Sequence, residues 1–292
     1  MMRVIYTGSY GEKLNFVCDS VKITNATFRK SLWEPVTSKL KYGERVLGFC
    51  KPPTTFKIDV VFFNREVFDI LDEVDRFNDV FEKDLINNKL GTLEVDGWFI
   101  DCFVTETEPL TVDGGIGRRF TIYAPSPFWV QKIIYNFEKE ESNTDESGSK
   151  MYNYEYDYKY SNDSSIKTFE NFHFIHCDFK IIAYGPFSEF FIDINGHIYQ
   201  VSVSLDNSEY LEIDSKKKII VKTDRMGNKI NCYNLQNYNS NVFQKIPTGV
   251  NTLGYNNQFG LEITLYQERS EPKYIWYFAI KKVNPLGSLT TI

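Results

Sequence analysis

The sequence has few residues of the kinds that form disulfide frameworks and metal sites. It contains five cysteines and three histidines in 292 residues. The cysteines are scattered, their number is odd, and none belongs to a CxxC pair, so we expect reduced structural thiols. These are Cys18, Cys50, Cys102, Cys177 and Cys232.

Long apolar runs and long basic stripes are also missing. No apolar run approaches the roughly 20 residues that a bilayer span requires, and residues 1–8 lack an extended signal-peptide core. The chain has 33 basic and 39 acidic residues, for a net charge of −6. That balance disfavours binding along nucleic-acid phosphates. We therefore expect no membrane span, no sequence-specific nucleic-acid partner, and synthesis in a cytoplasm.

Aromatic and apolar residues, in contrast, are plentiful. The chain has 24 Phe and 19 Tyr, and 42% of its residues are apolar. This content is too high for a disordered chain and favours β-strands. One segment, roughly residues 65–87, has apolar residues at three- and four-residue spacing, which predicts an amphipathic helix. Its apolar positions are Val67, Ile70, Leu71, Val74, Phe77, Phe81 and Leu85.

Turn dipeptides between alternating apolar segments predict β-hairpins. Asp96-Gly97 and Asn195-Gly196 are of the type that favours tight primed turns, and a third hairpin is expected around residues 225–228. A further strand is expected at residues 119–124. Many short strands at near-regular spacing are typical of a sandwich or jelly roll. The sequence therefore predicts a mainly β fold with one or two helices.

A polar, acidic stretch at residues 138–150 interrupts this pattern. It has no apolar residue to anchor it, so it is expected to be a linker or a long exposed loop. The length of the chain also exceeds the usual size of one domain. We therefore expect a first domain at residues 1–137 and a second, almost wholly β domain at residues 151–292.

Two segments contain residues that could bind a metal or a phosphate. His173, His176 and Cys177 have the right chemistry for zinc, but on the expected strand the two histidines would point to opposite faces. Residues 113–120 are glycine-rich and basic. The expected element after them is a strand, whereas a phosphate cradle normally precedes a helix. We expect no metal and no cofactor at either place.

Carboxylates occur close together in sequence at Glu106 and Glu108, and the sequence also offers Asp193 and Asp214. A glycosidase would need such a pair at a defined separation in space. Acidic residues are abundant, and no Ser or Cys nucleophile lies in a recognised setting. We therefore expect no enzyme activity and no catalytic residues.

A tyrosine stripe begins the expected second domain. Five tyrosines alternate with polar residues, so on a strand all five would lie on one face. Such a face either packs in a core or between domains, or stacks on sugar rings. The stripe comprises Tyr152, Tyr154, Tyr156, Tyr158 and Tyr160.

Motifs along most of the chain occur in a characteristic order. The first domain contains Gly91-Thr92-Leu93, then Trp98, Cys102 and Glu106, and finally the sequence Pro-Ser-Pro-Phe-Trp at residues 125–129. In the second domain, the tyrosine stripe precedes motifs at residues 184–186, 195–199, 211–215, 243–249 and 269–273. In this order the motifs resemble the siphophage distal tail protein family, which also occurs in phage-tail-like bacteriocins.

The resemblance implies a structural protein of the virion tail tip or of a prophage-encoded particle, made in the cytoplasm of a bacterial host. The first domain would close with copies of itself into a homo-hexameric ring, and a galectin-like β-sandwich would follow it. The ring would join the tail tube protein to the tail-tip hub or receptor-binding apparatus and leave a lumen for DNA.

The candidate interface residues are Trp98, Phe128 and Trp129, although either tryptophan could instead fill the core of its own domain. Two other functions remain open at this point. One is a carbohydrate-binding module acting on host surface glycans through the tyrosine stripe. The other is a tail enzyme that cleaves peptidoglycan.

Overall fold

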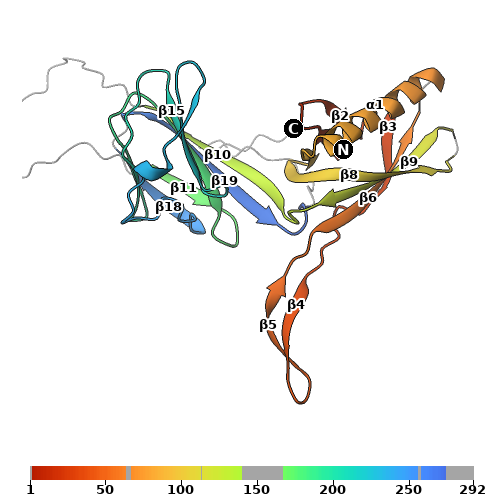
Figure 1. The fold of residues 1–292 in the computed structure, drawn as a ribbon, viewed down its shortest axis with the longest axis horizontal. Helices are drawn as coiled ribbons and strands as arrows, with labels where there is room; N and C mark the ends of the chain where they lie inside the picture. The colour runs from red at the N-terminus through yellow and green to blue at the C-terminus, as the bar shows by residue number, and fades with distance from the viewer. Residues whose placement is uncertain (1, 64–66, 113, 140–166, 256–257, 274–292) are drawn as a thin grey trace, which may run out of the picture. The chain divides into compact units, whose positions relative to one another are not determined.

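The computed structural model describes residues 2–63, 67–112, 114–139, 167–255 and 258–273 (Figure 1). The chain divides into two compact units. Unit 1 comprises Met1–Trp129 and Arg269–Ile292, and unit 2 comprises Val130–Glu268. The tyrosine stripe and most of the acidic stretch, residues 140–150, lie outside the described residues. The described part of the chain is mainly β, as the sequence predicts.

Nearly all strands of unit 1 lie before residue 125, and the unit also contains one long helix. The helix is α1, Val67–Ile86. The strands are β1 (Val4–Thr7), β2 (Lys13–Asn15), β3 (Val21–Ala26), β4 (Glu34–Lys39), β5 (Glu44–Cys50), β6 (Thr54–Phe62), β7 (Gly91–Val95), β8 (Trp98–Leu110) and β9 (Ile116–Ala124).

The long strand β8 connects the two antiparallel layers of unit 1. Its first part pairs with β7, which continues through β1 to β2. Its second part pairs with β9, which continues through β6 to β3. The strand passes from β7 to β9 between Cys102 and Phe103, and its register with β9 shifts just after this point, between Val104 and Glu106. A β-bulge of this kind bends a strand, which allows β8 to belong to both layers.

The helix packs against β6 and β8 with one apolar face. Phe77 lies at the centre of this face, in edge-to-face contact with Phe16 and Phe62 at ring-centroid distances of 5.3 and 5.1 Å. The predicted helix is confirmed, with bounds close to those expected. Its buried residues are Ile70, Val74, Phe77, Val80, Phe81 and Asp84.

Three apolar positions that define the predicted helix are exposed in the structure. Val67, Leu71 and Leu85 lie beside the buried stripe and are not part of it. The side of the helix that contacts the sheet is narrower than the sequence pattern suggests. Asp84 is buried on this side, and its carboxylate has hydrogen-bond partners there. No helix in the described ranges is long and apolar enough to cross a bilayer.

Unit 2 consists of strands and one short 3-10 helix at Tyr233–Leu235. The strands are β10 (Trp129–Phe137), β11 (Lys167–Asn171), β12 (Asp178–Tyr184), β13 (Phe190–Ile194), β14 (His197–Val201), β15 (Tyr210–Asp214), β16 (Ile219–Thr223), β17 (Lys229–Asn231), β18 (Gly249–Gly254) and β19 (Gly260–Arg269).

The strands of unit 2 form two layers that share one core. One layer follows the order β17-β16-β15-β12-β19-β10, and the other is a four-stranded sheet in the order β11-β18-β13-β14. Alternate residues of both layers are buried, for example Ile181 of β12 and Ile192 of β13. Unit 2 is therefore a β-sandwich.

The predicted hairpins form where the turn dipeptides place them. Asp96 and Gly97 join β7 to β8 with φ of 50° and 80°, and Asn195 and Gly196 join β13 to β14 with φ of 53° and 82°. These left-handed pairs are the geometry of a type I′ turn, which Asn-Gly and Asp-Gly favour. The third predicted hairpin joins β16 to β17.

Candidate assembly interface

The β4–β5 hairpin is the most exposed element of unit 1. The two strands pair only with each other among the described strands, as a separate two-stranded sheet. Figure 1 shows the hairpin extending beyond the β3–β6 pair. Its apolar side chains face solvent, and Tyr42, Phe49 and Leu47 are 82%, 65% and 63% exposed. An isolated two-stranded hairpin is only marginally stable in water, and a large exposed apolar patch marks an interaction site.

The base of the hairpin is held by an aromatic cluster that includes Phe128. The rings of Trp33 and Phe128 meet edge to face at 6.1 Å. The Lys51 ammonium lies over both rings, at 5.4 Å from the centroid of Trp33 and 5.7 Å from that of Phe128. Lys51 also donates a hydrogen bond to the Ser31 hydroxyl at 3.2 Å. Of the three candidate interface residues, Phe128 is therefore the one beside the hairpin.

Trp98 and Trp129 lie in the core of unit 1. Each is 1% exposed, and the ring of Trp129 packs on Phe56 and Phe28 at 5.8 and 6.3 Å between centroids. In the isolated chain both tryptophans fill the core, which is the second of the two roles that the sequence leaves open for them. The structure thus brings Phe128, but neither tryptophan, to the exposed hairpin.

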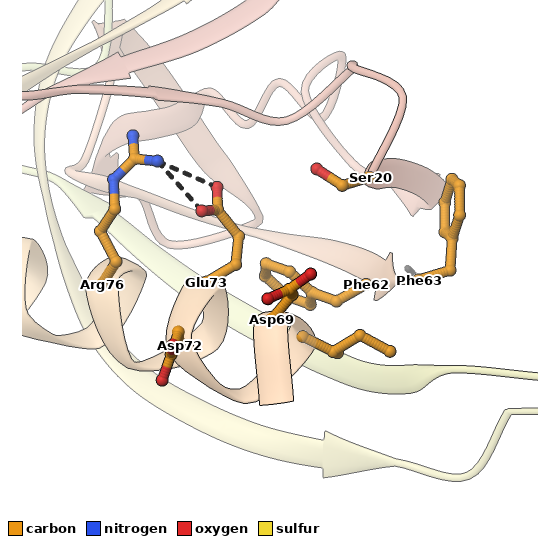
Figure 2. A pocket seen from close by; sticks show the side chains of 8 residues that line it. Ser20, Phe62, Phe63, Asp69, Asp72, Glu73 and Arg76 are labelled. Carbon is orange, nitrogen blue, oxygen red and sulfur yellow. Dashed lines mark hydrogen bonds and ion pairs between the residues drawn. The ribbon is translucent and has the colours of Figure 1, made fainter. Parts of the chain in front are cut away.

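A hollow of about 300 Å³ lies beside the first turns of α1. Figure 2 shows Arg76 joined to Glu73, with Asp69 and Asp72 on neighbouring turns and Phe62, Phe63 and Ser20 on the other side. The Arg76–Glu73 ion pair spans 3.0 Å. The carboxylates come from successive turns of one exposed helix, and within the described ranges no group of three or more His, Cys, Asp or Glu side chains could hold a metal ion.

The candidate carboxylates have structural partners, and only Glu106 and Glu108 share an element, β8. Glu106 accepts a hydrogen bond from the Thr121 hydroxyl at 3.0 Å, and Glu108 lies 3.9 Å from Arg119. Asp193 accepts the backbone N–H of the β13–β14 turn, whereas Asp214 accepts a backbone N–H that follows β15 in the other layer. The structure does not bring Asp193 and Asp214 together into one site.

The His173–Cys177 segment is not a strand, and that expectation was wrong. The chain bends between β11 and β12, because the Asn171 side chain accepts the backbone N–H of His173 and closes a tight turn. The thiol of Cys177 donates a hydrogen bond to the same Asn171 oxygen, and burial raises the pKa of this thiol to about 11. The segment is therefore an irregular connection in which His173 and Cys177 are buried and residues 174–176 are exposed.

Within the glycine-rich residues 113–120, the part from Ile116 onward belongs to β9. Gly117 is pressed against the backbone of β8, since a Cβ there would lie 2.7 Å from the Leu110 carbonyl oxygen. These glycines permit close strand pairing, and a strand rather than a helix follows them, as predicted.

The comparisons with known proteins found similarity of structure. No family profile and no curated protein matches the chain. The chain is similar to the Dit protein of phage SPP1, described as a paradigm of the hub adsorption apparatus in phages that infect Gram-positive bacteria, with a TM-score of 0.59 and 10% identity. The match covers 92% of this chain and 99% of that protein.

The chain is also similar to a protein of the phage P2 baseplate in its activated conformation with calcium. The TM-score is 0.60 and the identity 12%, over 93% of this chain and 100% of that one. Both matches extend over unit 1 and unit 2 and over the whole length of the compared proteins. The chain therefore has the fold of siphophage distal tail proteins, as the order of its sequence motifs predicts.

Proposed function

We propose that the protein is a structural subunit of the distal end of a phage tail, where six copies form a ring between the tail tube and the tail-tip hub. The similarity of fold to the SPP1 Dit protein and to the P2 baseplate protein supports this proposal. At 10–12% identity the fold is shared while nearly all side chains differ. The protein acts by assembly and carries out no catalysis.

The exposed β4–β5 hairpin carries the proposal that the chain assembles with itself. A monomer would leave its apolar side chains in water, which costs about 25 cal/mol for each Å² that a partner could cover. Burial of the hairpin against a neighbour removes this cost, and a heterologous contact that repeats around an axis closes into a ring. We propose that the ring contact includes the hairpin and that Phe128 supports its base.

The test is the mass of the full chain in solution. Light scattering with size-exclusion chromatography at micromolar concentrations should give six times the mass of 34.2 kDa, or a mixture that shifts towards it as concentration rises. Leu47→Asp should reduce the assembly to monomer, because a charge replaces an apolar side chain in the contact. A matched control is Met226→Asp, which changes an exposed apolar residue of unit 2. A wild-type chain that stays monomeric throughout would contradict the proposal.

A further inference from the structure

The outward face of α1 is an uninterrupted acidic stripe with an apolar residue at each end. Its residues are spaced by four and three positions, so they lie on one side of the helix. Phe68 and Ile86, at the two ends, are 79% and 81% exposed. The stripe comprises Phe68, Asp72, Asp75, Asp79, Glu82 and Ile86.

The four carboxylates of this acidic stripe are left unpaired in the part of the chain that the structure describes. Among the described residues none of them makes an ion pair or a hydrogen bond, whereas both basic residues of the helix are already paired: Arg76 with Glu73 and Lys83 with Glu12. Carboxylates three and four residues apart on a helix repel each other. The stripe therefore presents negative charge that the described part of the chain does not neutralise.

The tip of the β4–β5 hairpin has the opposite charge. Lys39, Lys41 and Arg45 lie within seven consecutive residues with one carboxylate, Glu44, and all four are exposed. Within the described ranges none of the three cations forms an ion pair. Leu40, Tyr42, Val46 and Leu47 interleave with them as exposed apolar side chains. The hairpin tip is thus both basic and apolar, and the acidic stripe is both acidic and apolar.

The hairpin and the helix are also long enough to contact each other along their lengths between copies. A seven-residue strand such as β5 spans roughly 20 Å at about 3.4 Å per residue. The helix rises about 27 Å from Phe68 to Ile86 at about 1.5 Å per residue. Figure 1 shows α1 and the β4–β5 hairpin on opposite sides of unit 1, so the hairpin does not cover the helix of its own chain.

We infer that the β4–β5 hairpin of one copy docks along the acidic stripe of α1 in the next copy. This inference rests on the proposed ring and names the two surfaces that meet in it. Each copy then offers one hairpin and one helix, which makes the contact head-to-tail and allows it to close. Charge complementarity fixes the partner and register, and the apolar side chains on both surfaces leave water.

Charge reversal of each surface in the full chain tests this contact. Variant A carries Lys39→Glu, Lys41→Glu and Arg45→Glu, so its hairpin and its helix are both acidic. Variant B carries Asp72→Lys, Asp75→Lys and Asp79→Lys, so both surfaces are basic. Each variant alone should be monomeric where the wild type assembles. Their equimolar mixture should regain the wild-type mass, because each hairpin then meets a helix of opposite charge and the copies alternate around an even-numbered ring.

The outcomes separate this inference from the proposed ring. Assembly of A or B alone to the wild-type mass would overturn hairpin–helix docking and leave the ring intact. Cooperative thermal unfolding of each variant checks that both are folded. Failure of the mixture of folded variants to assemble would also overturn hairpin–helix docking. Failure of the wild type to assemble would instead count against the ring itself. A control with Lys217→Glu and Lys229→Glu, which changes exposed charges of unit 2, should assemble as the wild type does.

Discussion

The hydroxyl of Tyr6 donates a hydrogen bond to Asp84 Oδ2 at 2.7 Å and ties the first strand of unit 1 to its helix. Both residues are buried, at 0% and 1% exposure. The other carboxylate oxygen of Asp84 accepts the backbone N–H of Ser9 at 2.9 Å. Burial, and then the hydrogen bond to Asp84, raise the pKa of Tyr6 well above its usual value, so the hydroxyl remains a donor.

Tyr6→Phe should destabilise unit 1 by about 1–3 kcal/mol, because the variant leaves a buried carboxylate oxygen without its donor. Chemical denaturation followed by tryptophan fluorescence measures this difference, since Trp98 and Trp129 lie in the same core. Tyr123→Phe is the matched control, because Tyr123 is exposed on β9. Equal unfolding free energies for Tyr6→Phe and the control would contradict the importance of this hydrogen bond.

The second prediction concerns the ion pair between Asp59 of β6 and Arg119 of β9, which are direct cross-strand partners. The guanidinium donates from Nε to Oδ1 at 2.6 Å and from Nη2 to Oδ2 at 2.8 Å. These hydrogen bonds hold the pKa of the Asp59 carboxyl below its usual value. Because the folded pKa lies below the unfolded one, the pair stabilises the fold above about pH 4 and loses this effect as the pH falls through the folded value.

Arg119→Gln should therefore lower the melting temperature at pH 7, and the difference from the wild type should close as the pH falls below about 4. Thermal unfolding at a series of pH values from neutral to acid measures this. Lys229→Gln serves as the control, because Lys229 is an exposed cation of unit 2 that forms no ion pair among the described residues, and it should show no such trend. A difference in melting temperature between Arg119→Gln and the wild type that stays constant across the pH series would contradict the stabilising role of the ionised Asp59 carboxylate.

The parts of the fold that could be predicted depend on short-range chemistry. The turns at residues 96–97 and 195–196 are specified by dipeptides that accept positive φ, and the helix by its apolar spacing. The division of β8 between two layers depends on pairing with distant strands and has no local pattern. The β4–β5 hairpin is not predicted, because its apolar residues lie on exposed faces and lack the one-sided alternation of a core strand. Its one local indication is Gly43, with φ of 79°, between Tyr42 and Glu44.

The candidate interface could be predicted only in part for a similar reason. Sequence alone does not distinguish an aromatic residue of the core from one at an interface, and Trp98 and Trp129 belong to the core. Phe128 belongs to the same motif as Trp129 but lies at the base of the hairpin, against Trp33. The charges of the hairpin tip and of the α1 stripe are visible in the sequence, but only the structure separates paired from unpaired charges.

The third prediction concerns the reactivity of the cysteine thiols. Cys50, at the end of β5, is exposed, whereas the sequence predicts that the cysteines are structural. A thiol reagent should modify Cys50 rapidly in the monomeric chain and Cys18, which is half-buried, more slowly. Cys102, Cys177 and Cys232 are buried and should react only after denaturation, because the reagent cannot reach them in the folded chain. Mass spectrometry over time measures the order. Cys50→Ser should remove the rapid phase, and a rapid phase that persists in this variant would disprove the assignment.

The last prediction concerns the acidic stretch at residues 138–150, which we expect to be the preferred site of limited proteolysis because it has no apolar residue to bury. Its N-terminal neighbour, β10, lies beside β19 in one layer of unit 2. Ile133, Tyr135 and Phe137 of β10 pack against the core of that unit, and the Tyr135 hydroxyl donates a hydrogen bond to the Glu170 carbonyl. A single cut should therefore give two bands on a denaturing gel and one peak in native chromatography, since β10 stays in its sheet.

A double variant tests whether β10 holds the cut fragments together. Tyr135→Ala with Phe137→Ala should let the nicked fragments separate, because the strand loses its apolar contacts. A first cut at residues 96–97 or 195–196, or separation of the nicked wild-type fragments without denaturant, would contradict this prediction.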